Sequence, residues 1–281
     1  MKQRIISGVI AAVLVLVLLA FRTSIVFNIV VMLVGLVALN EALCATRMVK
    51  NIALFLVSAL YTAFAAYFCY FANSGVWLFV TAAYLFVMLM LTIITHGRTK
   101  VTEIVYSAGM TLFIANSLAS VTYIADISRL YPDTYKEIDG LLLLFASFVA
   151  WISDTGAYFV GSKFGVNKLC PNVSPKKTVE GLCGGVIASV IYMLVIGFIF
   201  NTWVFDGYKV SLGWLMLMGL IGSLVSVAGD LFFSCIKRDC GLKDFGNIMP
   251  GHGGILDRID GTMFATVAVY LAFVLIYTIT L

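Results

Sequence analysis

Long, nearly uncharged apolar runs restrict what this sequence can fold into. Nine runs approach the length of about 20 apolar residues that a helix needs to cross a bilayer. They are residues 5–21, 24–45, 51–72, 75–95, 103–124, 140–161, 181–200, 211–232 and 262–280. All four prolines lie between these runs, as expected because a proline leaves a backbone carbonyl unpaired in lipid. The sequence therefore predicts an all-α, polytopic integral membrane protein with about nine transmembrane helices.

The composition supports a chain whose main solvent is lipid. Of the 281 residues, 62% are hydrophobic and only 11% are charged, whereas roughly a quarter are charged in a soluble domain. The net charge of +4 is too small to indicate a nucleic-acid partner. The first run follows Lys2 and Arg4 as a signal peptide would. Because it is long and no small-residue cleavage site follows, we interpret it as an uncleaved first helix.

The distribution of Lys and Arg predicts the orientation. The N-terminus and the gaps after the second, fourth, sixth and eighth runs carry 14 of these residues, and the opposite side carries 4. The positive-inside rule then predicts a cytosolic N-terminus and an external C-terminus. We expect an N-terminal scaffold of about five helices (1–138) and a C-terminal catalytic region (139–281) with cytosolic loops 162–180 and 233–261. The compact length favours a bacterial cytoplasmic membrane.

Asp230 lies near the predicted cytosolic end of the eighth run. Ser234 and Lys237 follow four and seven residues later, so the three side chains share one helical face. An acidic residue in or near hydrocarbon is costly and marks a functional site by default. The alternative is an aspartate at the membrane edge that faces water or pairs with Lys237.

Two further acids predict a metal site. Asp257 and Asp260 are i, i+3 neighbours if residues 257–260 are helical. Carboxylates this close repel each other unless a cation lies between them, and hard oxygen ligands suit Mg²⁺. Asp230 could supply a third ligand from the preceding helix. The alternative role for this pair is to complement the dipole at the start of a helix.

The loop before Asp257 is rich in glycine. Gly253 and Gly254 follow His252, and the free amides of such a loop form an anion-binding nest next to a helix N-terminus. A flexible turn would have the same composition, so this signal is weak alone.

A second polar segment covers residues 151–181. Asp154 lies inside the sixth run, and Lys176 and Lys177 follow a Ser-Pro turn. Two lysines held at a helix start could clamp a polyphosphate or a lipid phosphate. They would equally suit the positive side of a membrane beside anionic headgroups. Glu41, near the end of the second run, is the remaining membrane acid, and a snorkelling or capping role is favoured for it.

Three segments together resemble one family. The pattern Ser234-Cys-Ile-Lys-Arg238, four residues, Lys243-Asp244, then Pro250-Gly-His-Gly-Gly-Ile-Leu-Asp257-Arg-Ile-Asp260 resembles the signature of phosphatidate cytidylyltransferases. Asp154-Thr-Gly-Ala-Tyr158 and Ser174-Pro-Lys-Lys-Thr-x-Glu-Gly181 resemble that family too. Met249 is a conservative departure from the signature. The resemblance covers roughly the last 130 residues, and the first half is similar only in being apolar and multi-spanning.

The resemblance implies an Mg²⁺-dependent nucleotidyltransferase of phospholipid biosynthesis that converts CTP and phosphatidic acid into CDP-diacylglycerol and pyrophosphate. The expected catalytic residues are Asp154, Asp230, Lys237, Asp257 and Asp260, with Asp230, Asp257 and Asp260 as metal ligands. The expected substrate-binding residues are Lys176, Lys177, Ser234, Arg238, Lys243, His252, Gly253, Gly254 and Arg258. Membrane lipids are the surrounding partners, and a second metal ion and a homodimer are left open.

Three alternatives compete with this interpretation: a zinc site, another membrane enzyme of related chemistry, and a transporter. A zinc site at Cys235, Cys240 and His252 has spacing unlike that of structural zinc sites. A CTP-dependent polyprenol kinase or an enzyme that consumes CDP-lipids would use related chemistry, although the latter class lacks the Lys-Arg and His-Gly-Gly elements. A transporter with Asp154 and Asp230 as ion sites would more often show repeats and broken helices. The sequence does not specify acyl-chain preference or source organism.

Overall fold

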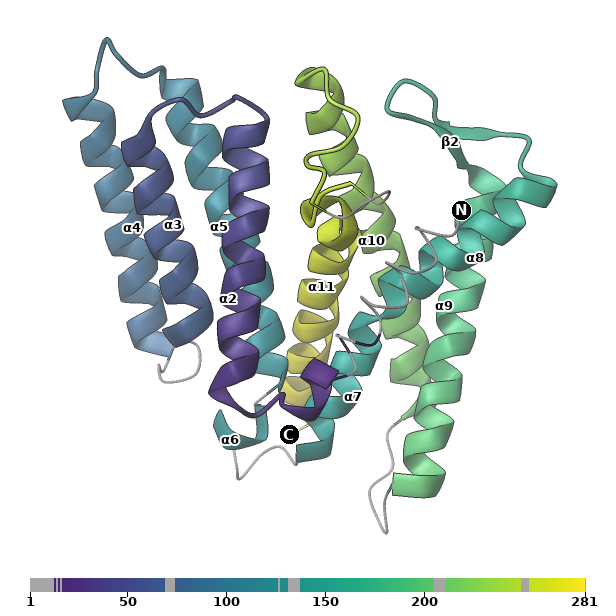
Figure 1. The fold of residues 1–281 in the computed structure, drawn as a ribbon. Coiled ribbons are helices and arrows are strands. Elements are labelled where there is room, and N and C mark those ends of the chain that lie inside the picture. The colour runs from purple at the N-terminus through teal and green to yellow at the C-terminus, as the bar shows by residue number, and fades with distance from the viewer. Residues whose placement is uncertain are drawn as a thin grey trace. The chain divides into compact units, whose positions relative to one another are not determined.

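The structure, a computed structural model, is almost entirely helical (Figure 1). It describes residues 17–68, 74–125, 127–130, 137–204, 211–248 and 253–280, together with residues 13 and 15. The chain divides into two compact units. Unit 1 comprises Met1–Asp126 and Asp239–Arg258, and unit 2 comprises Ile127–Arg238 and Ile259–Leu281.

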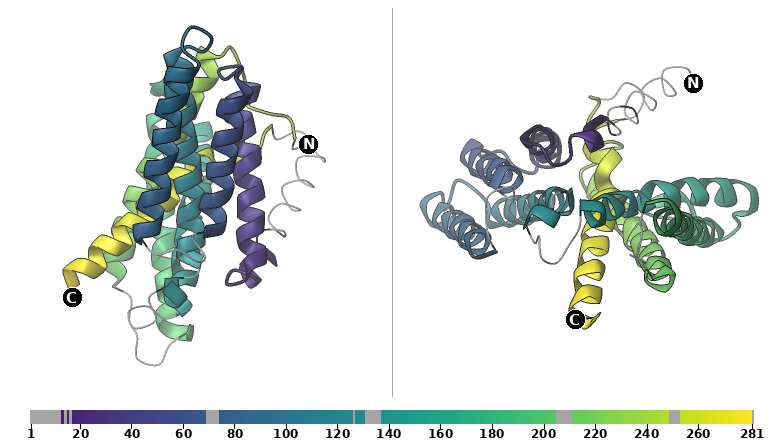
Figure 2. Two further views of the ribbon diagram at one scale, coloured as in Figure 1. Left: turned by 90° about the vertical axis from the view of Figure 1, so that its left-hand side faces the viewer. Right: turned by 90° about the horizontal axis from the view of Figure 1, so that it is seen from below.

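Unit 1 is built on an antiparallel bundle of long apolar helices, which Figure 2 shows from two further directions. The helices are α2 (Ile25–Asn40), which continues as the π-helix η1 (Glu41–Ala45), α3 (Ile52–Phe68), α4 (Ser74–Ile94) and α5 (Val101–Ala125). Helix α3 packs against α2, α4 and α5. Residues 239–258, which precede and begin the last helix, belong to this unit as well.

Polar side chains pair inside this bundle. Ser58 Oγ lies 3.3 Å from Tyr84 Oη and 3.1 Å from Ser107 Oγ, and Trp77 Nε1 donates to Asn116 Oδ1 over 3.2 Å. Hydrocarbon offers such groups no water, so hydrogen bonds between helices satisfy them and hold the bundle together.

Unit 2 contains the remaining helices and one β-hairpin. Its elements are α6 (Ile127–Leu130), α7 (Glu137–Ser147), α8 (Val149–Phe164), β1 (Lys168–Cys170), β2 (Ser174–Thr178), α9 (Val179–Ile199), the π-helix η2 (Phe200–Val204), α10 (Leu212–Asp239) and α11 (Leu256–Thr280). Helix α10 ends, and α11 begins, in residues assigned to unit 1. Helices α8 and α9 pack closely because of small residues: a Cβ on Gly184 would lie only 2.4 Å from Val160.

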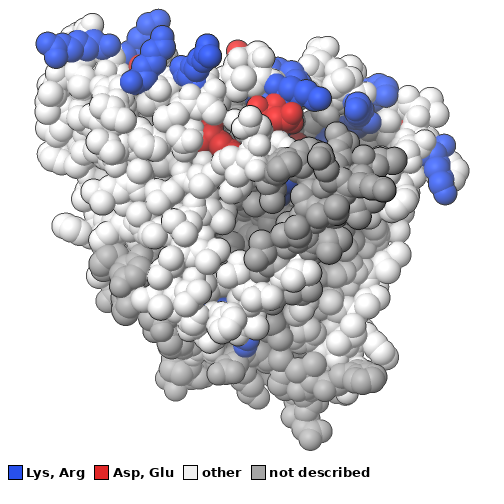
Figure 3. Space-filling model, in the orientation of Figure 1, with Lys and Arg blue, Asp and Glu red and all other residues white. Residues whose placement is uncertain are grey.

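The predicted fold class is confirmed. Six described helical segments are long and apolar enough to cross a membrane: Ile25–Ala45, Val76–Ile94, Val101–Ala125, Leu144–Phe164, Val179–Thr202 and Leu212–Asp239. On the face drawn in Figure 3, most of the visible charged side chains lie near one end of the helices, and few appear elsewhere among the described residues. The chain is therefore an all-α polytopic membrane protein. The count of nine spans stays a prediction, because most of the first run lies outside the described residues.

Several predicted boundaries differ from the structure. A turn at Phe148 divides the sixth run into α7 and α8, and the eighth run continues as helix to Asp239. Lys237 and Arg238 in that last turn suit the helix dipole, although their polarity ends the hydropathy signal. The ninth run begins six residues early, at Leu256. Loop 162–180 contains the hairpin β1–β2, in which Lys168 pairs with Thr178 and Cys170 pairs with Ser174.

Candidate active site

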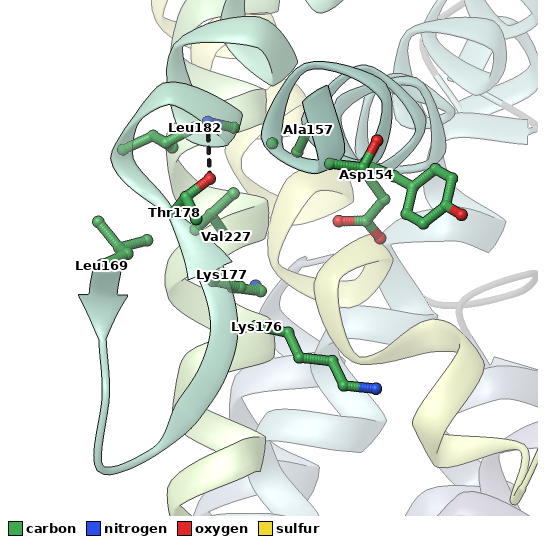
Figure 4. Close-up of a pocket in the computed structure, with 12 residues that line it drawn as sticks. Asp154, Ala157, Leu169, Lys176, Lys177, Thr178, Leu182 and Val227 are labelled. Atoms are coloured by element: carbon green, nitrogen blue, oxygen red, sulfur yellow. Dashed lines mark hydrogen bonds between the residues drawn. The ribbon is translucent and has the colours of Figure 1, made fainter. Parts of the chain in front are cut away.

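A pocket of about 350 Å³ opens in unit 2 between α8 and the β-hairpin (Figure 4). The lining residues are Asp154, Ala157, Tyr158, Gly161 and Ser162 from α8, Leu169, Lys176, Lys177 and Thr178 from the hairpin, Gly181 and Leu182 from α9, and Val227 from α10. The lining combines an acid and two lysines with apolar side chains. Such a pocket suits a ligand that is anionic at one end and apolar at the other.

The hairpin is fixed where it meets the start of α9. Thr178 caps this helix, because its Oγ1 accepts a hydrogen bond of 3.1 Å from Gly181 N. Glu180 accepts from the backbone amides of Val166 and Asn167 at 3.1 Å each, which fastens the segment leading into β1. Gly161 leaves room for the cap, since a Cβ there would lie 2.9 Å from Thr178 Oγ1. These contacts position the two lysines that precede Thr178.

Lys177 joins the hairpin to α10. Its Nζ lies 2.5 Å from Asp230 Oδ2, and the two side chains are 22% and 26% exposed. Ser234 Oγ lies 3.3 Å from Asp230 Oδ1, as expected for residues one helical turn apart. The sequence grouped Asp230 with Lys237, whereas the structure pairs it with Lys177. In Figure 4, Lys176 extends away from the hairpin and Lys177 points back toward α10.

Two carboxylates of unit 2, those of Asp230 and Asp154, lie within electrostatic range of a third, that of Asp260. Asp260, on α11, is influenced by Asp230 and Asp154 as well as by Lys237. Asp260 Oδ1 also accepts a hydrogen bond of 2.8 Å from Gly261 N. Asp154 is exposed and Lys237 is buried. Helices α8, α10 and α11 therefore each bring one acid into a region that also holds two lysines.

This set of oxygen donors fits a hard cation such as Mg²⁺ in its chemistry. A cation already lies beside Asp230, namely the ammonium of Lys177. Within the described ranges, however, no three His, Cys, Asp or Glu side chains converge as a ready-made metal site. Magnesium binding consequently stays a prediction, and so does the role of each acid as a ligand.

Asp257 has a different environment, in unit 1. It is 8% exposed, and its Oδ2 accepts hydrogen bonds from Phe245 N at 2.8 Å and Gly254 N at 3.0 Å. Glu41 accepts from the next two amides, Ile255 N at 3.1 Å and Leu256 N at 2.7 Å. These carboxylates close the loop between α10 and α11 onto the end of α2. The predicted metal-ligand role of Asp257 is untested, but its carboxylate already has a structural partner set.

The other residues predicted to bind substrate are spread over several segments. Arg238 Nε donates to Val173 O at 3.3 Å and so reaches the turn of the hairpin. Lys243 and Arg258 are exposed, and Gly253 has a positive φ of 85° that favours glycine. His252 lies outside the described residues.

The zinc alternative gains no support from the cysteines. Cys235 is exposed, and both Cys235 and Cys240 are free of disulfides. Burial raises the pKa of the Cys240 thiol, and the neighbouring Asp239 raises it further. Among the described residues, no three His, Cys, Asp or Glu side chains could hold a metal ion together. His252, the third residue of this alternative, lies outside them, so the zinc alternative stays untested.

Sequence reasoning missed the aromatic and small residues on the same face of α8 as Asp154. Tyr158 and Ser162 follow Asp154 at intervals of four residues and line the pocket with it. That spacing was available in the sequence. Only the hairpin, which places Leu169 opposite them, shows that this face of α8 lines a cavity rather than facing lipid.

Comparison with known proteins identifies the family. Residues 2–276 match the cytidylyltransferase family. Phosphatidate cytidylyltransferases of Staphylococcus epidermidis and Bacillus subtilis are 32% and 31% identical to this chain, over 94% and 96% of it and 95% and 96% of their own lengths. That of Staphylococcus saprophyticus is 38% identical over 180 residues, which is 64% of this chain and 62% of that protein. The chain therefore belongs to the cytidylyltransferase family.

Proposed function

We infer that this chain is a phosphatidate cytidylyltransferase, which transfers CMP from CTP to phosphatidic acid. The products are CDP-diacylglycerol and pyrophosphate. The full-length relatives of that name support this reaction. The structural observation that carries it is the pocket of unit 2, where Lys176, Lys177 and Asp154 meet an apolar wall beside the Lys177–Asp230 ion pair.

Both substrates are anionic, so the main task of the site is to neutralise and align phosphates. Lys176 and Lys177 line the pocket with positive charge, and Lys237 supplies more near Asp260. Leu169, Leu182 and Val227 provide an apolar wall that suits the glycerol and acyl portion of a lipid. We assign the pocket to the phosphatidate headgroup and the phosphates that it meets.

The reaction needs no general base from the protein. An oxygen of the phosphatidate phosphate is already anionic at neutral pH and forms a bond to the α-phosphorus of CTP. The bond from this phosphorus to the oxygen bridging it to the β-phosphate breaks, and that oxygen leaves with pyrophosphate. The lysines stabilise the charge that develops on the leaving group.

We assign Mg²⁺ to Asp230 and Asp260, with Asp154 nearby. These residues share one unit, and the carboxylate of Asp260 is influenced by those of Asp230 and Asp154. When bound, a divalent cation would neutralise phosphate oxygens. Asp257 retains its loop contacts in this assignment, and Lys243, His252, Gly253, Gly254 and Arg258 stay predicted phosphate contacts of the signature.

The proposed location is the cytosolic face of a bacterial cytoplasmic membrane. Lys and Arg are in excess on one predicted side of the membrane, which is the cytosolic side by the positive-inside rule. The segment with Lys176 and Lys177 lies on that same side. CTP would reach the site from water while the lipid stays in the bilayer.

The test is pyrophosphate release by the purified protein in detergent micelles. We expect release to require CTP, phosphatidic acid and Mg²⁺ together and to stop when EDTA removes the metal. Asp230→Asn should abolish release, whereas Asp239→Asn, which changes an exposed acid at the end of the same helix, should retain it. Release of CDP would indicate a kinase and release of CMP an enzyme that consumes CDP-lipids. Either product would overturn the proposal.

A further inference from the structure

Glu41 is a buried acid that the proposed chemistry does not use. It begins the π-helix η1 at the end of α2, and only 2% of its surface is exposed. An acid buried in a membrane protein is costly unless its charge is well satisfied. A π-helix segment often accompanies a functional site because it redirects side chains. The contacts of Glu41 account for its burial and for its place in the π-helix.

Both oxygens of Glu41 accept hydrogen bonds from the start of α11. Oε1 accepts from Ile255 N at 3.1 Å and Oε2 accepts from Leu256 N at 2.7 Å. The first amides of a helix have no partner within that helix, and their positive partial charge favours a carboxylate. Glu41 thus caps α11 from a position more than 200 residues earlier in the chain.

The surroundings of Glu41 are shaped to admit its carboxylate. A Cβ on Gly246 or Gly254 would come within 2.3 Å and 2.5 Å of the Glu41 oxygens, so these positions leave room only for glycine. The π-helix is itself supported, because Ala42 O accepts from Thr46 Oγ1 at 2.7 Å and from Tyr106 Oη at 3.0 Å. The carboxylate, the π-helix and the glycines therefore form one arrangement.

Asp257 completes this arrangement from within the loop. It accepts from Phe245 N and Gly254 N, so the two acids together bind four backbone amides between residues 245 and 256. The segment they hold contains most of the family signature between Lys243 and Arg258. One turn further along the same helix lies Asp260, the proposed metal ligand.

We propose that Glu41 is a positioning residue for catalysis: it holds the described ends of the loop, residues 244–248 and 253–256, and the start of α11 in the arrangement that the reaction needs. This inference rests on the proposed function for its link to turnover. Glu41 acts through backbone amides and does not contact substrate. The first half of the chain therefore contributes directly to the geometry of the signature.

The experiment compares Glu41→Gln with Glu103→Gln in the full-length protein. Glu103 is a matched control because it also accepts from two successive amides, Lys50 N at 2.7 Å and Asn51 N at 2.9 Å, just before a helix. Two readouts are needed: hydrogen exchange of backbone amides, and kcat and KM for CTP. A glutamine side chain keeps the shape but can offer only one oxygen to the two amides.

We expect Glu41→Gln to lose protection from exchange selectively in peptides covering residues 244–256. Its kcat should fall by about 10- to 100-fold, because a small misplacement of reacting groups has effects of that size. KM for CTP should change less than kcat. Glu41→Asp, which keeps the charge but shortens the reach, should recover part of the loss. Glu103 accepts both of its hydrogen bonds through Oε1 alone. Glu103→Gln should therefore retain both bonds, the protection around Lys50 and Asn51, and wild-type turnover.

Two outcomes would overturn the proposal. One is a Glu41→Gln enzyme whose kcat stays within about twofold of wild type, whether or not the loop loses protection. The other is a loss of turnover with loop protection unchanged, since Glu41 would then act on substrate directly. If the wild-type enzyme released no pyrophosphate, the proposed function would fail, while the exchange data would still show whether Glu41 holds the loop.

Discussion

Two groups of carboxylates in this protein are stabilised by different kinds of partner. In unit 1, Glu41 and Asp257 are buried and accept hydrogen bonds from backbone amides. In unit 2, Asp230 is a quarter exposed and is paired with the side chain of Lys177. Backbone amides are fixed by the fold and cannot leave. A lysine side chain can move aside. In the proposed function, the Asp230 carboxylate would then exchange Lys177 for a metal ion.

We therefore expect Glu41 and Asp257 to stabilise the loop, and the acids of unit 2 to take part in the proposed reaction. If it is correct, substitutions in unit 2 should reduce turnover without altering stability. Substitutions around Glu41 and Asp257 should alter the loop first and turnover as a consequence. Four predictions test this division.

The largest effect is expected from Asp260→Asn. Removing this charge should lower kcat by about 100- to 1000-fold, as loss of a major electrostatic group does at a reacting phosphate. The Mg²⁺ concentration needed for half-maximal activity should rise, and hydrogen exchange in residues 244–256 should stay as in wild type. Unchanged Mg²⁺ dependence would remove Asp260 from the proposed metal site.

Lys177→Met should reduce kcat by about 100-fold, because the pocket loses the cation that pairs with Asp230 and that is proposed to meet the phosphates. Pyrophosphate release at saturating CTP measures this. Lys163→Met is the control, since Lys163 is an exposed lysine in the last turn of α8 that does not line the pocket. Equal effects of the two substitutions would mean that only overall positive charge matters.

Asp257→Asn should act mainly on stability. Its hydrogen bonds to Phe245 N and Gly254 N involve a charged acceptor, so weakening them should cost about 1.5–3 kcal/mol. We expect a lower midpoint of thermal unfolding in detergent and faster exchange in residues 244–256. A protein that unfolds like wild type but needs far more Mg²⁺ would instead support the metal-ligand role predicted from the sequence.

The smallest effect is expected from Gly246→Ala. The added Cβ would meet the Glu41 carboxylate, and overpacking of this kind costs about 1–3 kcal/mol. Gly109→Ala on α5 adds the same methyl group where nothing lies within 4 Å, so it should be neutral or slightly stabilising. The thermal unfolding midpoints of the two variants measure the difference, and equal midpoints would contradict the close packing around Glu41.

Much of the local structure follows from the sequence alone. Apolar runs of sufficient length must form helices in lipid, because no other local structure satisfies their backbone groups. Helical spacing likewise places Ser234 one turn from Asp230, and their side chains do meet. The signature between Ser234 and Asp260 was enough to expect the family that the comparisons show. These features depend on contacts within a few residues.

Other features required the tertiary structure. The hairpin after α8 is short and polar, so no hydrophobic period reveals it, and its pairing places Lys177 against Asp230 rather than in solvent. Residues 239–258 group with the N-terminal helices in unit 1, a relation that spacing along the chain does not indicate.

Composition and spacing along a helix are local properties, and they were enough to predict the class of protein, its helices and a set of candidate site residues. The tertiary structure was needed to show which acid meets which partner. Asp230 meets a lysine 53 positions before it, and Glu41 meets amides 214 and 215 positions after it. Contacts over such separations depend on how distant helices pack, and no periodicity along the chain encodes them.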